Sequence, residues 1–413
     1  MIPSENYASK DVREALGSVL TNKYSEGYSH KRYYQGNRFI DEIEDIAVLR
    51  AKELFGVPHV NVQPYSGSPA NSAVYFALLA PNDIIMGLKL SGGGHLTHGH
   101  PDITFSGEYF RSVQYDVNEQ GIIDMDTVAV LAQKEKPKMI VVGTTAYPRM
   151  CDWKRWREIA DSVGAFFLAD ISHIAGLVVG GVHPSPVPYA DIVMTTTHKS
   201  LRGPRGAMLM VTDIGLKKDP DMGSKIDKAV FPGLQGGPHD NVTAAIAVAL
   251  DEASQSSFTQ YAEQVVKNAQ VLSETLLNEG IMLTTGGTDN HLMVIDLRPQ
   301  KLVGNIVAEA LEVAGIIVNK NSVPHDSNPP FYPSGIRLGT PALTTRGMKE
   351  DEMKQIGTWI AAVIREVSDY HLPEVKESRQ GFLSAAKKEL WENEELSGIA
   401  AEVKQLCARF PLP

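Results

Sequence analysis

The chain has 413 residues, enough for two or three domains of typical size. Hydrophobic residues make up 43% of it and charged residues 21%, a balance typical of folded globular proteins that argues against a disordered chain. The formal net charge of −10 argues against a broad basic surface for nucleic acid or for an anionic membrane. Any anionic substrate must therefore be attracted locally, by a few placed basic residues.

Cysteine usage and the absence of targeting signals favour a cytoplasmic location. Cys151 and Cys407 are far apart in the chain, which favours free thiols in a reducing compartment over a disulfide. The first residues lack the basic start and the apolar run of a secretory signal. No apolar stretch approaches the roughly 20 residues of a membrane-spanning helix. We expect a cytoplasmic protein that enters no membrane.

Two helices are predicted in the first part of the chain. Apolar residues recur at helical spacing over 39–55, with acidic residues between them. A second helix should begin near Ser68-Pro69, because serine suits an N-cap and proline suits the first helical turn. This helix should end before Pro81, at about residue 79.

The pattern changes between about 138 and 211 to short apolar strands alternating with helices. Such strands are typical of a mainly parallel sheet covered on both faces, and ligands of these sheets bind beyond the carboxyl ends of the strands. The residues just after each strand are therefore the first candidates for a site. The predicted strands are 139–142, 165–169, 192–194 and 207–211, with an amphipathic helix at 153–163.

A smaller α+β unit is predicted for the last third of the chain. A long helical region over 253–280 leads to it, rich in Ala, Glu, Gln and Lys. We divide the chain into an N-terminal segment at 1–25, a large domain at 26–265 and a small domain at 266–413. The further elements expected are a strand at 292–297 after the loop Thr284–His291, a helix at 301–314, a strand at 316–319 and helices from about 349 onward.

The strongest chemical signal is a lysine and an aspartate that each follow a predicted strand. Lys199 ends the polar run Thr195-Thr-Thr-His198-Lys199, and Asp170 follows the strand at 165–169. A partly desolvated lysine can be neutral near pH 7 and can form a Schiff base. Pyridoxal 5′-phosphate (PLP) needs such an amine for its aldehyde and a carboxylate that keeps its pyridine nitrogen protonated. Alone, the lysine would be interpreted as a surface residue and the aspartate as a turn cap; together they predict a PLP enzyme.

Two glycine-bearing segments are candidates for phosphate binding. Ser66-Gly67-Ser68 precedes the predicted helix, where free N–H groups and the helix dipole favour an anion. The loop Phe231–Pro238, which contains Gly236 and Gly237, is the second candidate. Each segment taken alone is better explained as a turn.

Two further segments suggest side chains for a ring and for a carboxylate. The run Gly92–His100 holds His95, His98 and His100 among glycines. It has no cysteine and no carboxylate pair, so we favour a flat imidazole stacked on a cofactor ring over a metal site. Arg337 lies in a strand-like run, where its guanidinium could bind a carboxylate at two points or form a structural ion pair.

Motifs along almost the whole chain, in consistent order, resemble the serine hydroxymethyltransferase family. The resemblance implies a homodimeric fold-type I PLP enzyme that converts L-serine and tetrahydrofolate reversibly into glycine and 5,10-methylenetetrahydrofolate. Departures from the usual motif occur at Tyr65, where many members have histidine, at Thr145, where many have serine, and over 147–150. The motifs are Ser4-Glu-Asn-Tyr7, Leu20–Tyr28, Lys31-Arg-Tyr-Tyr34, Asn61–Ser68, Gly94–Gly99, Thr195–Arg205, Thr288–His291, Asn319–Pro324 and Ser334–Pro341.

The resemblance also implies roles for individual residues around the cofactor. Lys199 would hold PLP, Asp170 would partner the pyridine nitrogen and His95 would stack on the ring. His173 and Thr145 would lie by the ring's phenolic oxygen. The phosphate would be served by Ser66, Gly67, Ser68 and His198, joined across the dimer by Tyr24, Gly236 and Gly237, and Thr196 would also bind the cofactor.

The remaining roles implied by the resemblance concern the two substrates. Glu26 would be the acid–base carboxyl at the hydroxymethyl group, and Tyr34 a hydroxyl close to the reacting atoms. Arg337 would hold the amino-acid carboxylate, with Ser4 and His173 nearby, and Arg205 would support the bound amino acid. Positions that resemble the pterin pocket are Leu90, Leu96 and Asn321.

Two alternative functions are compatible with part of these signals. A folate-independent relative, such as an α-methylserine hydroxymethyltransferase or a β-hydroxy-amino-acid aldolase, would share the scaffold. A catalytically inactive homologue acting as a binding protein is the second alternative. Retention of Glu26, Tyr34 and Asn321 argues against the first, and the Lys199–Asp170 pair argues against the second.

Overall fold

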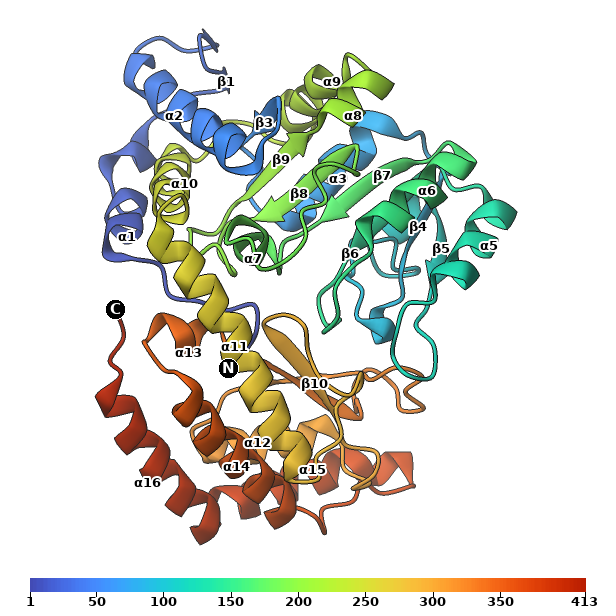
Figure 1. Cartoon of the computed structure of the whole chain (residues 1–413), viewed down its shortest axis with the longest axis vertical. Coiled ribbons are helices and arrows are strands. Elements are labelled where there is room, and N and C mark those ends of the chain that lie inside the picture. The colour runs from blue at the N-terminus through green and yellow to red at the C-terminus, as the bar shows by residue number, and fades with distance from the viewer.

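The computed structural model describes all 413 residues, which form two bodies connected by a long helix (Figure 1). This helix, α11 (Ser256–Asn278), runs from the body with the large sheet into the body that holds the C-terminal helices. Phe258 and Val265 belong to the core of the large sheet, whereas Ala269 and Leu272 belong to the core of the other body. This change of core along α11 supports a domain boundary near residue 265, which stays a proposal.

The large body is built on a seven-stranded sheet of order β3-β9-β8-β7-β6-β4-β5. All neighbouring pairs from β8 to β5 are parallel, whereas β9 is antiparallel to both of its neighbours. The prediction of an α/β fold with a mainly parallel sheet is confirmed. The strands are β3 (His59–Asn61), β4 (Ile84–Leu88), β5 (Arg111–Tyr115), β6 (Met139–Gly143), β7 (Phe166–Asp170), β8 (Ile192–Thr196) and β9 (Ala207–Val211).

The central strands are apolar throughout because helices cover both faces of the sheet. Successive side chains of a strand point to opposite faces. In β6, Ile140 and Val142 therefore pack in one core, while Met139 and Val141 pack in another. Each large apolar side chain buried in this way contributes about 1.5–3 kcal/mol to stability.

The two faces of the sheet are covered by different helices. The face that carries Ile140 is covered by α2, α5, α6, α7 and α10, whose apolar residues share its core, and the opposite face by α3 and α9. The bounds of the helices in this body are α1 (Lys10–Leu16), α2 (Arg38–Phe55), α3 (Gly67–Leu78), α4 (Phe105–Tyr109), α5 (Met125–Glu135), α6 (Trp153–Val163), α7 (Ala175–Val179), α8 (Asp213–Lys218), α9 (Met222–Lys228) and α10 (Asp240–Ala253).

Shorter elements connect these helices and strands. A two-stranded hairpin, β1 (Gly27–Tyr28) with β2 (Lys31–Arg32), lies ahead of α2. Short helical turns occur at η1 (Val19–Asn22), η2 (Leu90–Gly92), η3 (Ala229–Leu234) and η4 (Lys376–Ser378). None of the helices combines the length and the apolar character needed to span a bilayer.

The small body is a three-stranded antiparallel sheet, of order β10-β12-β11, packed against helices. The strand expected at 316–319 was misplaced, because Ile316 and Val318 pack into the core and pairing with β12 begins only at Asn319. Its elements are β10 (Leu292–Asp296), α12 (Gly304–Val313), β11 (Asn319–Asn321), β12 (Gly335–Gly339), α13 (Pro341–Thr345), α14 (Glu350–Glu366), α15 (Arg379–Trp391) and α16 (Glu394–Arg409).

Candidate active site

A polar cavity of about 310 Å³ lies at the carboxyl ends of β6, β7 and β8, where the strand pattern places a site. We call this cavity and its lining the cradle. Met194 is its single hydrophobic residue, so polar side chains define its chemistry. The lining is Ser4, Ser66, Gly67, Ser68, Asn71, His95, His98, Thr144, Thr145, Asp170, Ser172, His173, Met194, Thr196, His198, Lys199, Arg205 and Arg337.

Lys199 lies in the cradle with a pKa far below that of an ordinary lysine. Burial lowers its pKa to about 8. The charge of Asp170 raises this pKa, whereas the charges of Arg337 and Arg205 lower it further. Its Nζ donates a hydrogen bond to Thr196 Oγ1 at 2.9 Å. A substantial fraction of this amine is neutral near pH 8 and can attack an aldehyde.

Asp170 is buried and is held in the ionised form. Burial alone would raise the pKa of this carboxyl, but the hydrogen bond and charge of His98 hold it well below its usual range. His98 Nε2 lies 2.8 Å from Asp170 Oδ2, and Asn71 Nδ2 donates to the same oxygen at 3.0 Å. The backbone N–H of Ser172 donates to Oδ1 at 3.1 Å. A fixed carboxylate of this kind suits a protonated pyridine nitrogen.

Asn71 and His98 are functional candidates that the sequence analysis missed. Asn71 lies on α3 one turn after Ser68, so helical spacing from the predicted phosphate turn could have indicated it. His98 stands three residues after His95 in a run that was considered only for ring stacking and for metal. In the structure His98 contacts Asp170, and His95 Nδ1 lies 2.8 Å from Thr97 Oγ1.

A second part of the cradle, formed by the start of α3, is suited to an anion. Ser66 is the N-cap of α3, and its hydroxyl makes no capping bond, so the first N–H groups of this 12-residue helix lack that partner. Ser66, Gly67 and Ser68 all line the cavity. Gly67 leaves room there, since a Cβ at this position would lie 2.8 Å from Thr196 Cγ2. His198 Nδ1 is buried without a partner, and burial, aided by Lys199 and Arg205, lowers the pKa of His198 to about 3.

The arrangement of these groups fits PLP. The turn at Ser66–Ser68 can bind the phosphate, Lys199 can bind the aldehyde and Asp170 can pair with the pyridine nitrogen. His95, a flat ring in the same lining, is kept neutral because burial lowers its pKa to about 4. The unpartnered His198 Nδ1 and the uncapped turn are the observations that most require a ligand.

Arg337 reaches the cradle from the small body, on β12. Its Nη1 donates to Thr145 O at 2.6 Å and its Nε donates to Asn319 Oδ1 at 3.0 Å, whereas Nη2 has no partner within the chain. Burial lowers the pKa of Arg337 to about 10, so the guanidinium stays charged at neutral pH. His173, Thr145 and Ser4 line the same cavity and can surround a carboxylate there.

Five predicted site residues form a separate group, which we call the outer cluster: Tyr24, Glu26, Tyr34, Gly236 and Gly237. None of them lines the cradle of its own chain. A Cβ built on Gly236 would lie 3.6 Å from Glu26 Oε1, and the rings of Tyr24 and Tyr34 are 5.3 Å apart, edge to face. Glu26 is half-buried, whereas Tyr24 and Tyr34 are 60% and 47% exposed.

Tyr65 connects the cradle to the outer cluster. Its hydroxyl donates to Gly237 O at 2.7 Å, and its ring stacks on His239 at 4.2 Å. Its backbone N–H donates to Gln235 Oε1 at 3.0 Å, directly before the turn that begins at Ser66. Tyr65, which stands where many family members have histidine, therefore also provides a ring with a hydrogen-bonding group.

The three residues expected near a pterin do not line the cradle. Leu90 lies in η2 and Leu96 in the following loop, where it is 40% exposed. Asn321 ends β11, and its Nδ2 donates to Ser322 O at 2.6 Å.

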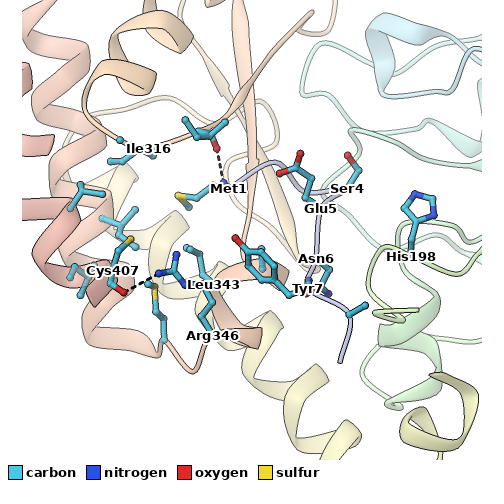
Figure 2. Close-up of a pocket in the computed structure, with 18 of the residues that line it drawn as sticks. Met1, Ser4, Glu5, Asn6, Tyr7, His198, Ile316, Leu343, Arg346 and Cys407 are labelled. Atoms are coloured by element: carbon cyan, nitrogen blue, oxygen red, sulfur yellow. Dashed lines mark hydrogen bonds between the residues drawn. The ribbon is translucent and has the colours of Figure 1, made fainter. Parts of the chain in front are cut away.

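A second cavity, of about 500 Å³, adjoins the cradle and shares Ser4, His198 and Arg205 with it. Figure 2 shows it between His198 on the large body and Leu343, Arg346 and Cys407 on the small body. Arg346 uses Nε and Nη2 to bind Phe410 O and Cys407 O. The lining is mostly hydrophobic and lacks a carboxylate–lysine pair, so the smaller cradle, and not this cavity, has the chemistry of a PLP site.

Comparison with known proteins agrees with this chemistry. The family model described as serine hydroxymethyltransferase matches residues 1–360. The chain is 53% identical over 413 residues to serine hydroxymethyltransferase of Desulfotalea psychrophila, covering 100% of this chain and 90% of that protein. It is 55% identical over 414 aligned residues to the protein of the same name from Acidothermus cellulolyticus, covering 100% and 91%.

Proposed function

The chain belongs to the serine hydroxymethyltransferase family, and we propose that it converts L-serine and tetrahydrofolate reversibly into glycine and 5,10-methylenetetrahydrofolate. The observation that carries the proposal is the cradle itself. It combines a lysine of lowered pKa, an ionised buried aspartate and an uncapped helix N-terminus in one cavity. A cytoplasmic location, expected from the sequence, is part of the same proposal.

PLP would be held along the length of the cradle. Lys199 would bind it covalently, Asp170 would pair with its pyridine nitrogen, and Ser66–Ser68, Thr196 and His198 would serve its phosphate. The bound cofactor supplies an electron sink for cleavage of the Cα–Cβ bond of serine. His98 and Asn71 would keep Asp170 ionised and oriented through their bonds to Oδ2.

The amino acid would bind between the two bodies. Arg337 has Nη2 free for a carboxylate, while its other nitrogens are held by Thr145 and Asn319. Ser4 and His173 can complete the hydrogen bonds to this carboxylate, and Arg205 can balance the charge of the bound amino acid. Because Arg337 is buried and preoriented, it would bind the carboxylate in one geometry.

The outer cluster supports a homodimer whose two chains share each site. Tyr24, Glu26, Tyr34, Gly236 and Gly237 carry chemistry yet lie outside the cradle of their own chain. A twofold axis would bring the cluster of one chain to the cradle of its partner, and the reverse, in one symmetric interface. Glu26 would then exchange a proton at the β-hydroxyl of serine, with Tyr34 beside it.

The folate would lie at the mouth of this shared site. Leu90, Leu96 and Asn321 are the residues proposed to contact the pterin. Leu96 is exposed enough to gain contact area from a flat ring, and Asn321 retains its side-chain Oδ1 for a hydrogen bond.

One assay separates this proposal from its alternatives. Glycine formation from serine should require tetrahydrofolate, and the purified protein should show the absorbance of bound PLP near the visible. Turnover that is independent of folate would indicate an aldolase or an α-methylserine enzyme. A protein without the PLP absorbance and without turnover would be an inactive homologue.

A further inference from the structure

Two buried histidines from different bodies meet at the wall of the cradle. His173 follows β7 in the large body, and His291 stands directly before β10 in the small body. His173 Nδ1 and His291 Nε2 are 3.3 Å apart, and their rings lie 5.5 Å apart at an angle of 26°. His173 lines the cradle, whereas His291 is completely buried behind it.

The position of His291 is imposed by the loop that precedes it. Asp289 N donates to Pro148 O at 2.8 Å, and Asn290 Nδ2 donates to Tyr147 O at 3.2 Å. On the other side, Thr340 N donates to His291 O at 3.1 Å. These hydrogen bonds connect the segment around His291 to both bodies. They hold the ring of His291 against that of His173, and neither ring takes part in them.

Both rings are neutral near pH 7. Burial lowers the pKa of His291 to about 3 and holds that of His173 well below its usual range, with further lowering by Arg337 and Lys199. In a neutral pair one ring nitrogen must donate and the other must accept. The hydrogen bond at one nitrogen of an imidazole therefore determines which tautomer is present at the other.

Two proton arrangements fit the 3.3 Å contact, and they differ in what they leave unpaired. If His173 donated, His291 would carry its proton on Nδ1, which is buried and has no partner. If His291 donates from Nε2, the unpaired Nδ1 is only an acceptor. Buried N–H groups without a partner are rarer than under-satisfied acceptors, so the second arrangement is favoured.

We propose that His291 is a positioning residue that donates Nε2–H to His173 Nδ1 and so makes His173 present Nε2–H to the amino-acid carboxylate. This inference rests on the proposed function of the cradle. A donor at this point complements the negative charge bound by Arg337, whereas a lone pair would repel it. Because His291 belongs to the small body and His173 to the large one, the donor is correctly set only when both bodies are docked.

Replacement of His291 tests this role with a conservative partner variant. His291→Leu should raise the KM for serine by roughly 10-fold or more, the scale of a lost charge-assisted hydrogen bond, and change kcat less. His291→Gln, whose amide can donate from nearly the same point, should stay within about threefold of the parent. His183→Leu is the control, because His183 is also buried, at 4% exposed, but lies outside the cradle and pairs with Pro184 O and not with His173. Equal KM values for His291→Leu and His183→Leu would overturn the proposal.

A double-mutant cycle asks whether His291 acts through His173. His173→Gln should itself raise the KM for serine, and His291→Leu added to it should cost less than about twofold more. If the KM increases of the two single variants multiply in the double variant, His291 acts independently of His173, which contradicts the inference. If His173→Gln leaves the KM unchanged in an active enzyme, the role of His173 fails; if the parent protein lacks turnover, the proposed function fails instead.

The tautomer can also be measured without any assay of turnover. Nitrogen-15 NMR of the full-length protein labelled in histidine distinguishes protonated from bare ring nitrogens. The His173 signals are those that disappear in His173→Gln. We expect a protonated Nε2 and a bare Nδ1 in the parent protein; the opposite assignment would overturn the proposal.

Discussion

The cradle and the outer cluster, which we propose to serve one reaction, are built in opposite ways. In the cradle, Asp170, His173 and Thr196 are 7%, 4% and 4% exposed, and each contacts partners within the chain. In the outer cluster, Tyr24 and Tyr34 are largely exposed. Groups that hold a charged cofactor need a pre-formed interior of low dielectric, whereas the groups that we propose to reach a partner chain must stay on the surface.

The outer cluster is exposed in its side chains but firmly held in its backbone. Arg32 Nη1 donates to Ser25 O at 3.0 Å and to Gly27 O at 2.8 Å, on either side of Glu26. Arg32 is itself buried and paired with Asp41 and Glu44. In the outer cluster, therefore, the side chains are exposed to solvent although the backbone that carries Glu26 is fixed by hydrogen bonds.

The largest expected effect is the loss of Lys199 from the cradle. Lys199→Ala should abolish covalent attachment of PLP and reduce folate-dependent turnover to background, because no other lysine lines the cavity. Borohydride reduction of the parent protein followed by peptide mapping should place the pyridoxyl label on Lys199. A label on a different lysine would contradict the assignment.

Removal of the Glu26 carboxyl should cost turnover without emptying the cradle. Glu26→Gln keeps the shape of the side chain but cannot exchange a proton, so folate-dependent turnover should fall by roughly 10²–10⁴-fold. PLP content and glycine binding, measured by absorbance and calorimetry, should stay near those of the parent. Glu42→Gln, an exposed glutamate on α2, is the control. Turnover of Glu26→Gln within a few-fold of the parent would assign proton transfer elsewhere, with Tyr34 as the next candidate.

Mixing the two variants tests whether the cradle and the outer cluster meet across a dimer. If each site is shared between two chains, a mixed dimer of Lys199→Ala and Glu26→Gln has one site with both defects and one site with neither. After the chains exchange, activity should recover to about a quarter of the parent value, because half of the dimers are mixed and each has one intact site. No recovery, despite exchange shown by a mass tag, would place both groups in one chain.

A smaller effect is expected for Arg337, which belongs to the cradle but comes from the small body. Arg337→Ala should weaken serine binding by about 1.5–3 kcal/mol, the range for hydrogen bonds to a charged group, while PLP stays bound. Calorimetric titration of the variant with serine measures this change. Arg365→Ala, which removes an exposed guanidinium paired with Glu279, should leave the affinity unchanged. Unaltered serine affinity of Arg337→Ala would rule out its role.

The pH dependence of cofactor uptake tests the burial of Lys199. Its free amine has a pKa of about 8 in the folded chain, so it is mostly protonated at pH 7 and mostly neutral at pH 9. Only the neutral amine attacks an aldehyde, so the rate of PLP uptake by the apoprotein should rise with pH and level off above about 8. The absorbance of bound PLP follows this reaction. A midpoint near the ordinary lysine value would mean that the amine is not desolvated.

The smallest expected effect concerns the connection between the two regions. Tyr65→Phe removes the hydrogen bond to Gly237 O but retains the ring stacked on His239. We expect a loss of about 0.5–1.5 kcal/mol in unfolding free energy, measured by urea titration, and a change in turnover of only a few-fold. A loss of turnover as large as that of Glu26→Gln would mean that the loop must be held rigidly for catalysis.

Local patterns in the sequence were sufficient for the sheet and for the central pair of the site. Continuous apolar runs separated by an amphipathic helix predicted parallel strands, and Lys199 and Asp170 could be placed at one edge because both follow such strands. These conclusions depend on the periodicity of side chains, which is a local property. The motifs that resemble a known family added the expected role of Glu26 and favoured carboxylate binding over a structural ion pair for Arg337.

Tertiary structure alone decided which groups act on those residues. Asn71 and His98 bind Asp170 although they are 99 and 72 residues away in the chain, and His291 meets His173 across 118 residues. It also separated Glu26 from the cradle of its own chain, although both lie in one sequence. Residue types and spacing determine which local elements form, but hydrogen-bond partners and pKa shifts arise from burial and from distances between elements, which exist only once the two bodies have packed.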